Sequence, residues 1–207
     1  TLLQGLSWWF DFDEPSDGSG PVARLDSVAG ESLTDNNTIA SATDGSDTVA
    51  SIVRANSEYF SHANGAKWQA GNNEFTFVGW LKPTTLNVNA GYVAKANECV
   101  FNQSGTDPNC ILYNGSGTIR AQVAAGAGLT NLATGAWYPF RFGYDKTRTR
   151  AFWQIGTGGL YYEKDTTGAP GTNTNAMFIG AFITQYYNGL AKNFAKYDRL
   201  LTWGEWV

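Results

Sequence analysis

Two aspartates near the start of the chain, Asp11 and Asp13, have the residue types and spacing for acid–base or metal chemistry. Alternating residues over Leu6–Glu14 predict a strand, on which residues two apart share one face about 6.5–7 Å from each other. Retaining glycosidases hold two carboxyl groups about 5–5.5 Å apart, so a catalytic pair is one interpretation. Calcium binding is a second, because Ca²⁺ takes carboxylate oxygens. In the third, both side chains face solvent or bind the backbone of residues 24–37.

A second candidate site is the run Gln185, Tyr186, Tyr187 and Asn188, just before a strand predicted over Leu190–Tyr197. Aromatic rings next to amide side chains suit the recognition of a sugar, which needs an apolar face and a few placed polar groups. The run therefore predicts a glycan-binding loop. The alternative is a packed loop or one that faces another subunit.

The two cysteines, Cys99 and Cys110, flank a loop between two predicted strands. They would meet across the neck of the hairpin, where closing a loop of about 12 residues contributes about 3 kcal/mol in the chain-entropy model. A disulfide and two free thiols are both left open. A zinc site is not expected, because two cysteines and the single His62 do not supply four ligands.

Short strands separated by tight turns must position these groups. The clearest strand is Glu74–Pro83, in which we place Trp80 in the core, and Trp137 is placed in the core from a later strand. Many short strands at regular spacing, with no convincing long helix, are typical of a β-sandwich. No linker or repeat divides the chain, so residues 1–207 are predicted to form a single domain.

Composition limits the partners of this domain. The 14 Lys and Arg residues are scattered and outnumbered by 18 Asp and Glu, so we expect no nucleic acid. No apolar run reaches the roughly 18–20 residues of a membrane helix, so we expect no membrane association. Only 15% of residues are charged, against about 25% in ordinary soluble domains. Together with the terminal tryptophans Trp8, Trp9, Trp203 and Trp206, this favours an oligomer or a larger assembly.

Several segments follow one another in a distinctive order: Phe75–Pro83, Tyr92–Lys95, Trp137–Asp145, Arg150–Ile155, Met177–Gly180 and Asn188–Thr202. In this order they resemble LamG-like domains of the concanavalin A-like lectin/glucanase superfamily. The resemblance implies an all-β fold, a two-sheet antiparallel jelly-roll β-sandwich.

The chain also departs from that family. The family's Asp-Asp pair in the closing strand is Lys192-Asn193 here, so a metal role of those carboxylates is not carried over. The glucanase branch carries a Glu-x-Asp-x-x-Glu or Glu-x-Asp-x-Glu strand, which this chain lacks, so we expect no enzyme activity. No cofactor is required. Calcium binding stays open, either at Asp11 and Asp13 or in the oxygen-rich loops Asp44–Asp47 and Asp107–Asn109.

The front of the chain adds a narrower resemblance. The segments Trp8-Trp9-Phe10-Asp11, Arg24-Leu25-Asp26-Ser27 and Leu33–Asn37 look like LamG-like modules of phage structural proteins. This implies a non-catalytic module at a virion surface or outside the cell, either a capsid decoration protein or a fibre domain. Its partners would be virion structural subunits, copies of itself in a homo-oligomer, and host glycans. The alternative is a free extracellular carbohydrate-binding or glycan-cleaving domain.

Overall fold

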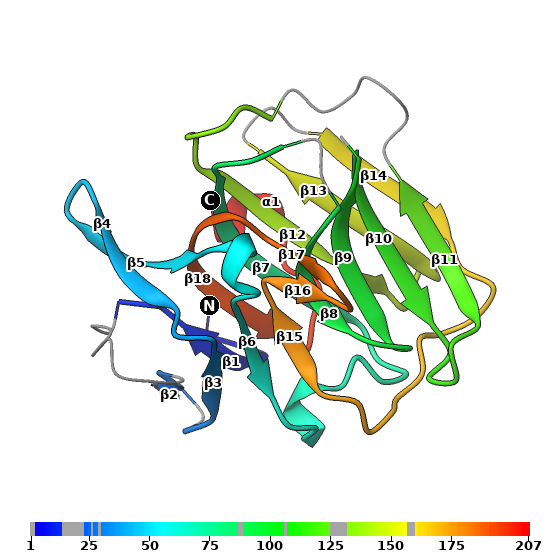
Figure 1. Ribbon diagram of the computed structural model, residues 1–207. Helices are drawn as coiled ribbons and strands as arrows, with labels where there is room; N and C mark the ends of the chain where they lie inside the picture. The colour runs from blue at the N-terminus through cyan, green and yellow to red at the C-terminus, as the bar shows by residue number, and fades with distance from the viewer. Residues whose placement is uncertain are drawn as a thin grey trace.

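Regular structure in the described part of the chain is almost entirely β. The computed structural model describes residues 3–13, 23–25, 27–28, 30–86, 89–105, 107–124, 132–156 and 160–207. Within these ranges the strands form two large sheets and one short hairpin (Figure 1). The helical pieces found there are η1 (Arg54–Asn56), η2 (Ala66–Trp68) and α1 (Trp203–Trp206). The expected all-β fold class is confirmed, and none of these helices is long and apolar enough to span a membrane.

The first large sheet, sheet A, is antiparallel and contains the closing strand of the chain. Its strands are β1 (Leu6–Phe10), β4 (Ala40–Asp44), β5 (Asp47–Ile52), β7 (Phe75–Pro83), β12 (Tyr138–Asp145), β13 (Arg150–Ile155), β14 (Leu160–Asp165) and β18 (Gly189–Tyr197). They lie in the order β14-β13-β12-β7-β18-β5-β4, and β1 pairs with β18. Strands from both ends of the chain therefore meet in this sheet.

The second large sheet, sheet B, is also antiparallel. Its strands are β2 (Ala23–Leu25), β3 (Ser32–Asn36), β6 (Tyr59–His62), β8 (Ala90–Lys95), β9 (Cys99–Ser104), β10 (Asp107–Tyr113), β11 (Ile119–Ala124) and β15 (Met177–Ile179). They lie in the order β11-β10-β9-β8-β15-β6-β3-β2. The short hairpin pairs β16 (Ala181–Phe182) with β17 (Gln185–Tyr186).

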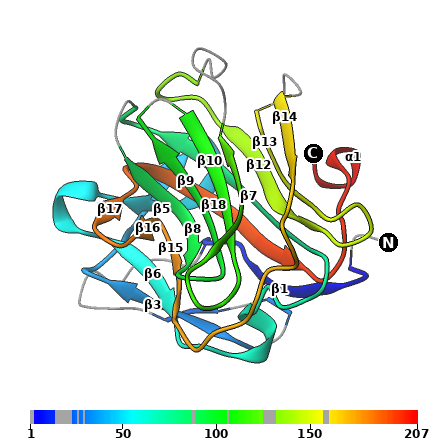
Figure 2. The same cartoon turned by 90° about the vertical axis from the view of Figure 1, so that its right-hand side faces the viewer.

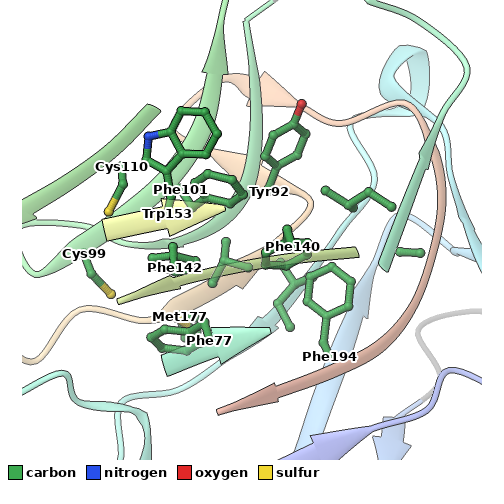
Figure 3. Close-up of a cluster of buried hydrophobic side chains, with 14 of the residues drawn as sticks. Phe77, Tyr92, Cys99, Phe101, Cys110, Phe140, Phe142, Trp153, Met177 and Phe194 are labelled. Carbon is green, nitrogen blue, oxygen red and sulfur yellow. The ribbon is translucent and has the colours of Figure 1, made fainter. Parts of the chain in front are cut away.

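The main core fills the space between the two sheets (Figures 2 and 3). Phe77 and Phe142 of sheet A stack with ring centroids 4.9 Å apart, and Phe101 of sheet B stacks on Phe142 at 5.1 Å. Burying one such side chain stabilises the fold by about 1.5–3 kcal/mol, and each aromatic contact adds about 0.5–1.5 kcal/mol. These rings hold the two sheets face to face.

Alternation along the strands places the tryptophans on different faces. Trp8, Phe10 and Phe12 are fully buried in the main core, which confirms the predicted inward face of the first strand. The placement of Trp80 and Trp137 in the core is wrong, because both are only half-buried. In β7 the inward positions alternate through Phe77 and Leu81, so Trp80 points to the outer face of sheet A.

The two cysteines are buried free thiols. In the β9–β10 pairing Cys99 is opposite Leu112 and Cys110 is opposite Phe101, so the cysteines are not cross-strand partners. The predicted meeting across the hairpin neck is wrong for this reason, and the disulfide is absent. Both side chains lie in the main core near Trp153 and Met177 (Figure 3).

A smaller cluster lies on the outer face of sheet A and joins the two ends of the chain. Its fully buried members are Val78, Ala195, Tyr197 and Leu201, against which Leu6, Trp9 and Trp206 pack. The terminal tryptophans therefore do not form the free aromatic ends expected from the sequence, since Trp8 is buried and Trp9 packs on Trp206. Because Trp8, Trp9 and Trp206 pack within the chain, their presence no longer favours an oligomer.

Candidate functional site

Asp11 and Asp13 lie in a polar depression of about 460 Å³ beside the β4–β5 hairpin. The strand ends at Phe10, and Phe12 has a left-handed backbone with φ of 64°, so the two aspartates do not continue a regular strand face. The Asp11 carboxylate accepts a hydrogen bond from the Ser27 hydroxyl at 2.9 Å, whereas Asp13 is exposed. The structure thus brings both predicted residues together but gives them different environments.

The depression also contains residues that the sequence did not group with this pair. Its described lining is Asp11, Asp13, Ser46, Asp47, Thr48, Lys192 and Asn193. Asn193 has a φ of 53° and lies where the β18 register to β7 shifts, which marks a β-bulge. The bulge brings the Asn193 amide to the backbone oxygen of Asp11 at 3.3 Å. One feature of the sequence pointed to these residues: Lys192-Asn193 stands where the LamG-like family has two aspartates.

Two lysines neutralise the carboxylates of the oxygen-rich loop. Lys192 forms an ion pair with Asp47, and Lys82 forms one with Asp44 at 2.7 Å. The Lys192 ammonium also lies 4.7 Å from the ring centroid of Trp137, whose indole N–H donates to Asp44. The hydrogen bond and the charge of Lys192 lower the pKa of Asp47, and hydrogen bonds from Lys82 and Trp137 lower the pKa of Asp44. Both carboxylates are therefore ionised at neutral pH and already have cationic partners.

A shallow hollow of about 60 Å³, which we call the aromatic ledge, is lined by five residues: Tyr59, Phe178, Ala181, Ile183 and Tyr186. The ring centroids of Tyr59 and Phe178 are 5.5 Å apart in an edge-to-face arrangement, and those of Tyr59 and Tyr186 are 6.0 Å apart. All three rings are half-buried, so each keeps part of its surface in contact with solvent. The arrangement offers apolar ring surface on the outside of sheet B.

Close backbone packing holds the β16–β17 hairpin over this sheet. A side chain at Gly91 of β8 would overlap the backbone of Ala181, so the hairpin can lie directly against β8. At the tip, Ile183 is 71% exposed and has a φ of 59°, a conformation that is unfavourable for a β-branched residue. The fold thus holds an apolar side chain in solvent next to the rings.

The predicted glycan loop divides into a surface half and a structural half. Tyr186 lies in the ledge, and Gln185 is half-buried with its side-chain oxygen unpaired in the described structure. Tyr187 is only 2% exposed and its hydroxyl donates to the Leu190 carbonyl at 3.1 Å, so its expected role as a ligand contact is wrong. The Asn188 side chain accepts from the Arg54 amide and donates to the hydroxyls of two threonines, so its polar groups are occupied.

Tyr59 and Phe178 were missed by the sequence analysis. They come from β6 and β15, which are far apart in the chain but are paired in sheet B. Nothing local in the sequence indicates that their rings join Tyr186.

Comparison with known proteins supports the architecture. No family model matches this chain, and no curated protein matches it either. Among solved structures, the binding domain of Paraclostridial Mosquitocidal Protein 1 superposes with a TM-score of 0.76 at 11% identity, covering 99% of this chain and 51% of that chain. The binding domain of botulinum neurotoxin serotype C1 gives a TM-score of 0.70 at 7% identity, with coverages of 99% and 51%.

A third structure matches over nearly its whole length. Domain 4 of AbnA, a GH43 extracellular arabinanase from Geobacillus stearothermophilus solved with arabinotriose, gives a TM-score of 0.62 at 16% identity and covers 97% of this chain and 95% of that chain. This chain spans about half the length of the two toxin domains. These likenesses show a shared β-sandwich fold. The narrower LamG-like and phage resemblances stay predictions.

Proposed function

We propose that this chain is a non-catalytic carbohydrate-binding module that acts outside the cell and takes a sugar on the aromatic ledge. The observation that carries the proposal is the convergence of the half-exposed rings of Tyr59, Phe178 and Tyr186 from three strands. Aromatic rings provide the apolar surface on which the C–H face of a sugar packs. Gln185, beside Tyr186, supplies a free amide oxygen that accepts a hydrogen bond from a sugar hydroxyl once the side chain turns to solvent.

The chemistry of the ledge favours an uncharged sugar. Its described lining consists of Tyr59, Phe178, Ala181, Ile183 and Tyr186, which carry no formal charge at neutral pH. An acidic sugar would lose hydration at its carboxylate there without gaining a cationic partner. We therefore assign neutral glycans to the ledge.

The carboxylates of the polar depression support a non-catalytic role. A glycosidase needs one carboxylic acid whose pKa is raised enough to protonate the leaving group. Lys192 has the opposite effect on Asp47, because its ammonium lowers the pKa of that carboxyl. The Asp11 carboxylate accepts a hydrogen bond from Ser27 and Asp13 is exposed, so the two carboxylates do not form a pair enclosed in apolar surroundings.

The similar structures lend support of a general kind. The AbnA domain was solved with an arabinose oligosaccharide and belongs to an extracellular enzyme. The two toxin domains are described as binding domains. Binding, either by name or as a complex with an oligosaccharide, is what these three descriptions have in common.

The finer part of the proposal concerns a virion. We propose that the module belongs to a decoration protein or a fibre at the surface of a phage-like virion. There it contacts structural subunits or host glycans and assembles with copies of itself. Its support is the resemblance of Trp8–Asp11, residues 24–27 and Leu33–Asn37 to phage modules. Asp26 of that pattern lies outside the described residues. A free extracellular carbohydrate-binding module is the alternative, and co-sedimentation with virions separates the two.

A glycan array of neutral and acidic sugars, followed by calorimetry on the hits, tests the ledge. Tyr186→Ala and Phe178→Ala are each expected to weaken neutral-glycan binding at least about fivefold, taking as a guide the about 1–3 kcal/mol by which a nucleic-acid base stacks on an aromatic side chain. Tyr161→Ala is the matched control, since Tyr161 is 37% exposed on β14, away from the ledge. Failure of all neutral glycans to bind, or binding that Tyr186→Ala leaves intact, would overturn the assignment.

A further inference from the structure

A hollow of about 220 Å³ lies on the outer face of sheet A, where the segment after β18 passes β12, β13 and β14. Figure 2 shows α1 and the end of the chain beside these strands. The described lining is Arg141, Arg148, Phe152, Tyr161, Leu200, Leu201 and Thr202. Arginine, aromatic and aliphatic side chains thus share one small concave surface that is distinct from the aromatic ledge.

Arg141 is the unusual member of this lining. Its Nε donates to the side-chain oxygen of Gln154 at 2.9 Å, and its Nη1 donates to the Leu201 carbonyl. Both acceptors are neutral. Within the described ranges Arg141 has no carboxylate partner, and its Nη2 donates no hydrogen bond. A guanidinium has five N–H donors, so most of this fork is unused.

The aromatic side chains hold the guanidinium in place. Its central carbon lies 5.4 Å from the ring centroid of Phe152 and 5.5 Å from that of Tyr161. Arg141 is half-buried, and this burial lowers the pKa of its guanidinium, although the group stays charged at neutral pH. A partly desolvated guanidinium that is held in place and has no carboxylate in direct contact is a favourable partner for an incoming anion.

The carboxylates around the hollow are already engaged. Arg148 pairs with Asp145 and, at 2.9 Å, with Glu163. Glu205 pairs with Arg199 at 2.9 Å and caps the backbone and hydroxyl of Thr202. These ion pairs engage the carboxylates nearest to Arg141, of which Glu205 acts on its guanidinium only through space.

We propose that this hollow is a second binding site, one that takes a carboxylate-bearing sugar such as a uronic acid. The carboxylate pairs with the free N–H groups of Arg141, since arginine and carboxylate form parallel hydrogen bonds. The sugar ring then lies against Tyr161 and the side chain of Leu200. The ledge and this hollow face opposite sides of the sandwich, so one module would bind neutral and acidic sugar residues at separate places.

Titration of the protein with glucuronate, monitored by NMR, tests the site. Glucose is the control ligand, because it lacks the carboxylate. Glucuronate is expected to shift resonances of Arg141, Tyr161 and Leu201 in a saturable way at millimolar concentration, and more weakly at high salt. Glucose is expected to bind there at least about tenfold more weakly, and acetate separates a bare carboxylate site from a sugar site. Saturation by acetate as tight as by glucuronate would overturn the sugar assignment.

Arg141→Gln is expected to abolish the glucuronate response, whereas Lys164→Gln, which removes an exposed positive charge of β14 outside the lining of the hollow, is expected to change it less than about threefold. Arg141 also anchors the Leu201 carbonyl, so circular dichroism and neutral-glycan binding at the ledge serve as folding controls. If Arg141→Gln does not fold, Tyr161→Ala replaces it and is expected to weaken glucuronate alone. The proposal is overturned if glucuronate gives no saturable response, or if Arg141→Gln or Tyr161→Ala leaves that response unchanged. Neither outcome affects the proposal for the ledge.

Discussion

The indole rings of Trp9 and Trp206 meet edge to face with their centroids 6.2 Å apart. One ring comes from the first strand and the other from the last helix, and both pack on Val78, Tyr197 and Leu201. The contact closes the two ends of the chain over the outer face of sheet A. The C-terminal segment that leads to Trp206 also reaches Arg141 of β12, because the Arg141 Nη1 donates to the Leu201 carbonyl at the hollow.

Replacing Trp206 with alanine is expected to lower the free energy of unfolding by about 1–3 kcal/mol, because half-buried apolar area and one aromatic contact are lost. Urea denaturation followed by fluorescence measures the change. Trp203→Ala is the control, since Trp203 is also half-buried but lies outside the cluster around Trp9. Equal losses for the two variants would mean that the end-to-end contact contributes nothing of its own.

The inward and outward positions of β7 are expected to differ in their contribution to stability. Phe77 is 1% exposed and stacks on Phe142, so Phe77→Ala should cost about 3–5 kcal/mol. Trp80 is half-buried on the outer face, so Trp80→Ala should cost only about 1–2 kcal/mol despite the larger side chain. Thermal or chemical unfolding of both variants measures the two losses of stability. A greater loss of stability for Trp80→Ala than for Phe77→Ala would reverse our assignment of the faces.

Cys99 and Cys110 are expected to be unreactive in the folded protein. Burial raises the pKa of both thiols above the ordinary value of 9.0, so they stay neutral and only their ionised form attacks a disulfide reagent. Above pH 9 the unfolded chain loses these protons while the folded chain keeps them, so the contribution of the thiols to stability falls as pH rises. Labelling with a thiol reagent should therefore need denaturant, and rapid labelling of the native protein would contradict the burial.

Removing Lys192 is expected to raise the pKa of Asp47 toward its ordinary value of 3.8, because the hydrogen bond and charge that lower it are lost. A lowered carboxyl pKa stabilises the fold above the unfolded value, and this contribution disappears as pH falls through the folded pKa. NMR titration of Lys192→Ala measures the shift. Asp44 is the internal control, since its pKa is lowered mainly by hydrogen bonds from Lys82 and Trp137 and should move little.

Local sequence determined the fold class and the inward face of the first strand. Strand alternation has a period of two, so Trp8, Phe10 and Phe12 could be placed in the core without knowledge of their neighbours. The same reasoning failed for Trp80, because apolar residues occupy both faces of β7 and only the second cluster of side chains decides which face is outer. Alternation also breaks within β18, because the bulge at Asn193 lets both Ala191 and Phe194 face the main core.

Tertiary structure alone decided which residues form a site. The register of β9 and β10 separates Cys99 from Cys110, although their spacing suited a hairpin. The ledge joins Tyr59, Phe178 and Tyr186 because β6 and β15 are neighbours in sheet B and the β16–β17 hairpin folds back over β8. A sequence pattern reports periodicity within one element, whereas strand order, register and backbone approach depend on the packing of many elements at once, and these relationships bring distant side chains onto one surface.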